Sequence, residues 1–170
     1  MTEQNTQSLR ILGVDPGTAT TGWAVIEEDN KGEMKTIAYG HISTSKNNSD
    51  EDRLLEISSD LNRIIGKHRP EEAAIEQIFF FKNQKTVIQV AQSRGAIILT
   101  LKQNGVRIAS YTPLQIKQAL TGYGRADKKQ IQEMTKSILK LNALPKPDDT
   151  ADAIAIAICH INSRKMASMK

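Results

Sequence analysis

Four acidic side chains stand at sequence positions where a carboxylate is unusual. Asp15 ends an apolar segment directly before a Pro-Gly pair, and Glu76 lies inside a second apolar segment. Asp149 and Asp152 are three residues apart at the start of an apolar helical segment, so they share one face of that helix. Carboxylates rarely occupy such surroundings unless they are paired or bound to a cation. The pattern therefore predicts that these acids gather around a cation.

Such a cluster suits divalent metal ions. Magnesium and manganese are hard cations that take carboxylate oxygens and keep water at their remaining positions. Two such ions would activate an attacking water and stabilise the leaving oxygen during phosphodiester hydrolysis. Each acid also has an ordinary structural interpretation: Asp15 as a turn former, Glu76 as an edge residue and Asp149 as a helix cap. Those roles together leave Glu76 and Asp152 poorly explained, which favours the metal site.

Hydrophobic periodicity predicts the elements that must position these acids. We expect strands over residues 10–15, 22–28, 34–43, 73–78 and 106–111. We expect helices over residues 50–68, 82–103 and 112–120, a further one through Ile131, Met134, Ile138 and Leu141, and a last one over 148–163. The segment TGYGRADKK between them is expected to be a loop. This order predicts an α/β protein with a five-stranded mixed sheet flanked by helices.

Composition limits the classes to which the chain can belong. With 170 residues, 39% apolar and 25% charged, it has the size of one globular domain. No apolar segment is long enough to cross a bilayer, and the polar first residues indicate no secretory signal. The single cysteine, Cys159, excludes an internal disulfide framework and a cysteine zinc cluster, and it favours the reducing cytoplasm.

Charge is distributed unevenly along the chain. Residues 1–76 carry 8 basic and 14 acidic side chains, whereas residues 77–146 carry 12 basic and 2 acidic ones. A basic surface on one part of the fold favours a polyanion such as nucleic acid as the partner. A lysine surface that serves solubility is the alternative explanation.

Four segments in this order resemble the RuvC family of Holliday junction resolvases: ILGVDPGTATTGWAVI, AAIEQIFFFKN, AQSRGAI and DDTADAIAIAICH. The resemblance covers residues 10–160. It implies an RNase H-like fold, a homodimer, and magnesium-dependent cutting of four-way DNA junctions in homologous recombination and DNA repair. It also implies action together with the RuvA and RuvB branch-migration proteins.

The resemblance assigns roles to particular residues of this chain. The family's catalytic, metal-binding acids match Asp15, Glu76, Asp149 and Asp152, with two Mg²⁺ ions per subunit and Mn²⁺ as a substitute. Some relatives have histidine at the position of Asp149, and Asp148 beside it is interpreted as a helix cap. Three further residues match DNA contacts of the family: Lys117 and Lys128 at the scissile phosphate, and Phe79 stacked on a base.

Several points stay open at this level. We expect residues 1–9 to be an extension, 10–163 a single nuclease domain and 164–170 a short basic tail. The apolar stripe of the helix over 82–103 would suit either a dimer interface or the core. A DNA-binding module without catalytic activity is one alternative function. A nucleotide-binding domain of the actin and sugar-kinase type is another, because DPGTATTG fits its first phosphate loop, although the chain is short for two lobes.

Overall fold

The computed structural model describes residues 8–78 and 84–168, and it is built around one five-stranded sheet. The strand order is β3-β2-β1-β4-β5. Strands β1, β2 and β3 pair antiparallel, whereas β4 and β5 join β1 in a parallel arrangement. The strands are β1 (Leu9–Asp15), β2 (Thr20–Glu28), β3 (Met34–Ser43), β4 (Glu72–Glu76) and β5 (Arg107–Tyr111). The predicted five-stranded mixed sheet is therefore confirmed.

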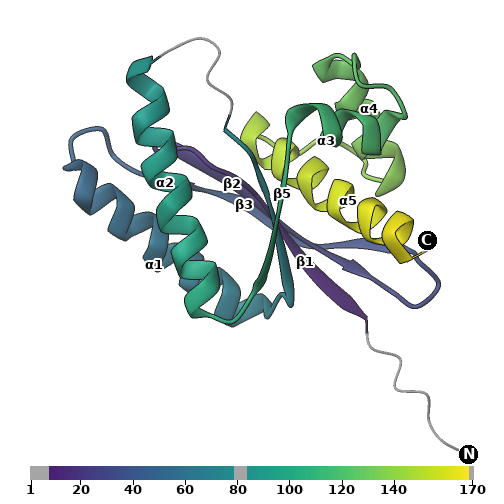
Figure 1. Ribbon diagram of the computed structural model, residues 1–170, viewed down its shortest axis with the longest axis horizontal. Helices are drawn as coiled ribbons and strands as arrows, with labels where there is room; N and C mark the ends of the chain where they lie inside the picture. Colours follow the sequence, from purple (N-terminus) through teal and green to yellow (C-terminus); the bar gives the residue numbers. More distant parts are fainter. Residues whose placement is uncertain (1–7, 79–83, 169–170) are drawn as a thin grey trace, which may run out of the picture.

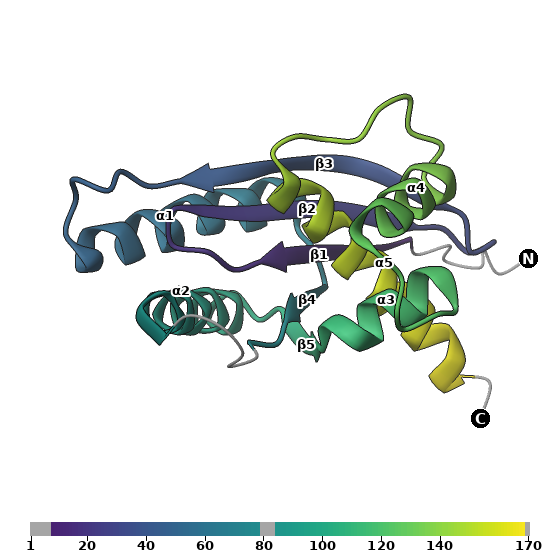
Figure 2. The same cartoon turned by 90° about the horizontal axis from the view of Figure 1, so that it is seen from above.

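Helices cover both faces of the sheet. Figure 1 shows α1 and α2 on one face and α3, α4 and α5 on the other, and Figure 2 shows the same two layers from above. The helices are α1 (Asp50–His68), α2 (Gln84–Gln103), α3 (Pro113–Thr121), α4 (Lys128–Ile138) and α5 (Asp148–Ser168). None of these helices has the length and apolar composition needed to cross a membrane.

Alternation along β1 divides the core into two layers. Leu12 and Val14 point into the cluster shared with α1 and α2, whereas Ile11 belongs to the cluster around α5. Because side chains alternate between the faces of a strand, Gly13 and Asp15 lie on the α5 side with Ile11. The carboxylate at the end of β1 is thereby directed toward the helix that carries the last two acids.

Two glycines allow α5 to lie directly on the sheet. A Cβ at Gly13 would collide with the backbone of Ala153, and a Cβ at Gly22 would collide with the carbonyl of Asp149. Helix α5 is itself almost fully buried from Ala153 to Ile161. The close approach places the first turn of α5 beside the carboxyl end of β1.

The structure differs from the sequence-based expectations at several element ends. Strand β4 ends at Glu76, so the predicted extension to residue 78 is wrong. Helix α5 continues past Ser163 to Ser168. Lys128 is the first residue of α4, where the expectation was a loop, because Asp127 and Gln130 form a capping box there. These corrections leave the strand order unchanged.

Candidate active site

Asp15 and Glu76 lie side by side at one edge of the sheet. Strands β1 and β4 are parallel neighbours, and Val14 pairs with Ile75 in their register. The next residue of each strand is an acid, and both strands end there. Two carboxylates from adjacent strands therefore meet at the carboxyl end of the parallel part of the sheet.

The N-terminal part of α5 brings the other two acids to the same place. Its position is fixed by Thr150, which is fully buried and donates from its hydroxyl to the carbonyl of Gly40 on β3, 3.1 Å away. Asp149 and Asp152 flank this anchor and are partly exposed. Three different elements, β1, β4 and α5, thus contribute the four predicted carboxylates.

The pKa values of three of the four acids are raised, partly by the negative charges of their neighbours. Burial raises the pKa of Asp15 to about 8, with further contributions from Glu76, Asp152 and Asp149. Burial also raises the pKa of Glu76, and the charge of Asp152 adds to the effect. The pKa of Asp152 is raised by burial as well, although Lys128 opposes that shift. Partly buried carboxylates that repel one another in this way favour binding of a cation.

Both predicted lysines line a groove beside this cluster. The groove has a volume of about 220 Å³, and its wall includes Glu76, Asp152, Lys117 and Lys128. Nζ of Lys128 lies 3.6 Å from Oδ2 of Asp152. The same ammonium lies 2.9 Å from Oδ2 of Asp148, a contact that the helix-cap interpretation of Asp148 did not include. The groove thus joins acidic and basic groups at the carboxyl end of β4.

The donor chemistry of the cluster fits a hard divalent cation, because all four side chains offer carboxylate oxygens. As the side chains stand, no three acids, histidines or cysteines in residues 8–78 and 84–168 form a group that could hold a metal ion. Lys128 instead lies against Asp152 and supplies a positive charge. Binding of an ion by several of these carboxylates therefore requires a rearrangement from the positions that the side chains have here.

Two further sequence-based expectations concern the base contact of Phe79 and the apolar stripe of α2. Phe79 lies outside the described residues, so its predicted base contact stays a prediction. The apolar stripe of α2 is partly core, because Ile97 and Leu101 are fully buried. A separate face of the same helix exposes Ile88 and Leu99, which are 66% and 59% accessible.

Sequence reasoning missed Arg94, which holds the end of β4 in place. Its guanidinium donates from Nε to the carbonyl of Glu76 at 3.2 Å and from Nη2 to Oγ of Ser110 on β5 at 2.9 Å. Arg94 therefore ties α2 to the backbone that carries one of the acids. It lies in the segment AQSRGAI, so the signal was an arginine within an otherwise small and apolar helical segment.

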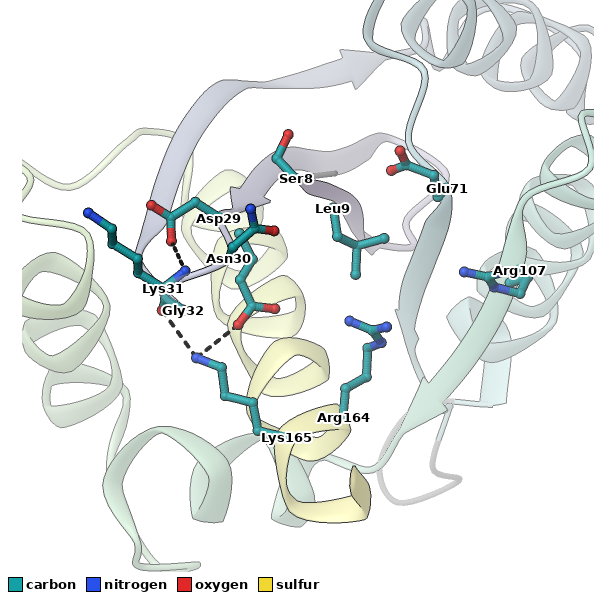
Figure 3. A pocket seen from close by; sticks show the side chains of 11 residues that line it. Ser8, Leu9, Asp29, Asn30, Lys31, Gly32, Glu71, Arg107, Arg164 and Lys165 are labelled. Carbon is teal, nitrogen blue, oxygen red and sulfur yellow. Dashed lines mark hydrogen bonds and ion pairs between the residues drawn. The ribbon is translucent and has the colours of Figure 1, made fainter. Parts of the chain in front are cut away.

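A larger cavity of about 720 Å³ lies at the opposite ends of the parallel strands. Figure 3 shows Arg107, Arg164 and Lys165 around it. All three cations are already paired: the two arginines bind buried Glu72, at 2.7 and 3.0 Å, and Lys165 binds Glu28 at 2.9 Å. The basic side chains in the wall of this cavity are therefore engaged in ion pairs within the chain. The cavity also lies away from the acidic cluster.

The sheet order and the acids at the strand ends define an RNase H-like protein with an acidic centre. The chain matches the family model described as "Crossover junction endodeoxyribonuclease RuvC" over residues 11–160. It therefore belongs to the RuvC family.

Individual relatives agree with this assignment. The protein of that name from Caldicellulosiruptor saccharolyticus is 54% identical over 155 residues, which cover 91% of this chain and 93% of the relative. The solved structure of Thermus thermophilus RuvC is 30% identical, with a TM-score of 0.88 over 94% of this chain and 97% of the other. A structure of T. thermophilus RuvC in complex with a Holliday junction substrate, also 30% identical, has a TM-score of 0.89 over 94% and 96% of the two chains.

Proposed function

We propose that this chain is a metal-dependent endonuclease that resolves four-way DNA junctions by paired, symmetric nicks, in homologous recombination and DNA repair. The observation that carries the proposal is the meeting of four carboxylates from β1, β4 and α5 beside two lysines. Family membership supports the class of reaction. The substrate is supported by the relative that was solved with a Holliday junction.

In this mechanism the four carboxylates would hold Mg²⁺, two ions per subunit, and Mn²⁺ could replace it. When bound, the metal would supply an activated water nucleophile and charge neutralisation at the leaving oxygen. Asp15 lies centrally, because the charges of Glu76, Asp149 and Asp152 all act on it. Lys117 and Lys128 line the groove and hold the scissile phosphate there by charge-assisted hydrogen bonds. Phe79 is proposed to stack on a base near the junction centre.

A second copy of the chain completes the proposed enzyme. A four-way junction has near two-fold symmetry, so a two-fold dimer can place one acidic centre on each of two opposed strands. We propose the exposed face of α2 as the interface, because Ile88, Gly95 and Leu99 lie on one side of this helix. A Cβ at Gly95 would meet nothing within 4 Å in the monomer. Glycine weakens a helix interior, so its presence there suits close approach by a partner helix.

Sedimentation of Leu99→Glu and Gly95→Ala variants tests this interface. The first variant places a charge in the contact and shifts the dimer toward monomer. The second adds a methyl group that stabilises the free helix while weakening the dimer. Leu114→Glu on α3, a residue of similar exposure, serves as the control. If both α2 variants sediment like the wild type, the interface lies elsewhere.

Family membership also supports the proposal that the RuvA and RuvB branch-migration proteins act with this chain. We place the protein in the cytoplasm, because its single cysteine, Cys159, is fully buried and forms no disulfide. We also propose that residues 10–163 form one nuclease domain.

A supercoiled plasmid that extrudes a cruciform tests two points at once: whether the protein cuts a four-way junction, and whether it makes the two nicks as a pair. Two nicks made within one binding event convert the plasmid directly to the linear form, whereas a single nick only relaxes it. We expect linear product in Mg²⁺, none in chelator, and none from a plasmid without the cruciform. Binding of the cruciform without any cutting in Mg²⁺ or Mn²⁺ would instead support a DNA-binding module that has no catalytic activity.

A further inference from the structure

A second cavity, separate from the lysine groove, adjoins the acidic cluster at Asp149. Its volume is about 350 Å³, and its lining includes the loop residues Gly17 and Thr18, together with Arg53, Gln89 and Asp149. Asp152, one helical turn from Asp149, lines the lysine groove instead. The acidic cluster therefore borders two hollows, one lined by two lysines and the other by a single arginine.

Arg53 gives this cavity its positive charge. The residue lies in α1 and is only 8% exposed, although it is an arginine. Its Nε donates to Oγ1 of Thr44 at 2.8 Å. The nearest carboxylate, that of Asp50, is 4.0 Å from Nη1 of Arg53 and is itself half exposed. A buried guanidinium normally has a closer anionic partner, because removing the charge from water is costly.

The loop that faces Arg53 is held in a fixed shape. The hydroxyls of Thr18 and Ser93 are hydrogen-bonded at 2.8 Å, and Thr18 is buried. The hydroxyl of Thr44 donates to the carbonyl of Thr18 at 2.6 Å, so the residue that binds Arg53 also binds the loop. A cavity wall that is already ordered loses little entropy when it binds a ligand.

We propose that this cavity binds a backbone phosphate of the DNA strand that is cut, next to the scissile phosphate, with Arg53 as the phosphate-binding cation. The inference rests on the proposed function and adds a subsite to it. A guanidinium matches the geometry of a phosphate and forms paired hydrogen bonds with its oxygens. The scissile phosphate then lies in the lysine groove, and the neighbouring phosphate of the same strand lies in this cavity.

Asp50 lies against Arg53 and Gln89, two lining residues of the cavity, and would compete there with a phosphate. Its Oδ1 accepts from Nε2 of Gln89 at 3.5 Å and is the same oxygen that faces Arg53. The phosphate therefore displaces a loosely held carboxylate. Removing that carboxylate should strengthen binding of the DNA, which gives the proposal a second test in the opposite direction.

The experiment measures junction binding in chelator, so that nothing is cut, over a range of salt concentrations. Arg53→Gln should lower affinity about 10-fold and reduce the slope of log affinity against log salt by about 1. Asp50→Asn should raise affinity a few-fold. Lys67→Gln, at the exposed far end of α1, is the matched control for loss of one positive charge.

Replacing single phosphates near the cut by neutral methylphosphonates identifies the phosphate concerned. The wild type and Arg53→Gln should bind equally well to the junction whose methylphosphonate replaces the phosphate that Arg53 contacts. On that junction the contact between Arg53 and the phosphate is missing for both proteins. An Arg53→Gln penalty that is equal on every substituted junction would overturn the proposal. If Arg53→Gln fails to fold, Asp50→Asn decides the question, and unchanged or weaker binding by that variant overturns it. Cutting of the cruciform by the wild type separately establishes that the proposed function holds.

Discussion

Nζ of Lys128 lies 3.6 Å from Oδ2 of Asp152, although the two residues belong to different helices and are far apart in the chain. Lys128 is the first residue of α4, and Asp152 lies near the start of α5, just after its first turn. The pairing places a cation at the acidic cluster without neutralising it, because burial still raises the pKa values of Asp15 and Asp152. Lys128 is thus placed next to the proposed binding sites of the metal ions and the scissile phosphate.

Replacing Lys128 should impair cutting more than folding. Lys128→Ala removes a phosphate contact from the groove, and we expect the cleavage rate to fall by about 10–100-fold, or about 1.4–2.7 kcal/mol. Its side chain is half exposed, so the unfolding temperature should change little. Single-turnover cleavage of a junction measures the effect. Lys129→Ala is the control, because Lys129 is exposed and does not line the groove. Equal losses in the two variants would contradict the assignment.

The ionisation of Asp15 should make the metal-free protein less stable as the pH rises. Its pKa is about 8 in the folded protein against an ordinary value of 3.8. Between these values the folded state holds a proton that the unfolded state releases, so the free energy of unfolding falls as the pH increases. The stability associated with the protonated Asp15 is fully present below about pH 4. It falls as the pH rises further and is lost once the pH passes about 8.

Asp15→Asn tests that dependence, because an amide does not ionise. In chelator at pH 8 we expect the variant to be more stable than the wild type by about 1–3 kcal/mol, and the difference to shrink toward pH 4. Denaturant unfolding at several pH values measures it, with Asp60→Asn on α1 as the control. The same variant should not cut DNA. Parallel pH profiles for the wild type and Asp15→Asn would contradict the electrostatic account.

The contact between Gly22 and α5 predicts a large effect from one methyl group. Gly22→Ala places Cβ against the carbonyl of Asp149, so α5 must move or the fold must absorb the strain. We expect destabilisation of about 2–4 kcal/mol and loss of cutting. Gly66→Ala is the matched control, because its Cβ meets nothing and alanine favours a helix. That variant should be as stable as the wild type or more so.

His160 connects α5 to two strands, and its removal should destabilise the fold. Burial lowers its pKa, which favours the neutral ring. Nε2 lies 2.6 Å from the carboxylate of Glu72, and Nδ1 lies 2.7 Å from the hydroxyl of Tyr111. In the tautomer that suits both partners, Nε2 donates to Glu72 and Nδ1 accepts from Tyr111. His160→Phe leaves both partners with one bond fewer, and we expect a loss of about 1–3 kcal/mol in urea unfolding. His41→Phe, on an exposed histidine, is the control. Equal stability of wild type and His160→Phe would show that the network contributes little.

Local patterns were sufficient to predict most of the fold. The strand over 34–43 and the helix over 50–68 begin and end where the sequence predicts, because turn residues and period changes mark their limits. The four acids were found because each contradicts the apolar pattern around it. Their meeting at one point depends on strand order and on the close approach of α5, which no single segment specifies.

The start of α4 and the inward-facing Arg53 also have recognisable sequence patterns, although neither was predicted. The Asp-x-x-Gln pattern at Asp127 and Gln130 is a capping box, and it marks the start of α4 inside the segment that was expected to be a loop. Arg53 lies in register with Ile57 and Leu61 on the buried side of α1, which indicates an arginine that faces inward. The partners of His160 come from β4 and β5, so only the tertiary structure reveals that network.

The most direct test of the account compares binding and cutting of a labelled mobile four-way junction by the wild type and Asp152→Asn. In Mg²⁺ the wild type should make symmetric nicks on the junction and none on a matched linear duplex. Asp152→Asn should bind the junction at least as tightly, because it carries one negative charge fewer, and should not cut it. Cutting by Asp152→Asn at the wild-type rate, or cutting by the wild type in chelator, would contradict the assignment of the four carboxylates as one metal-dependent centre.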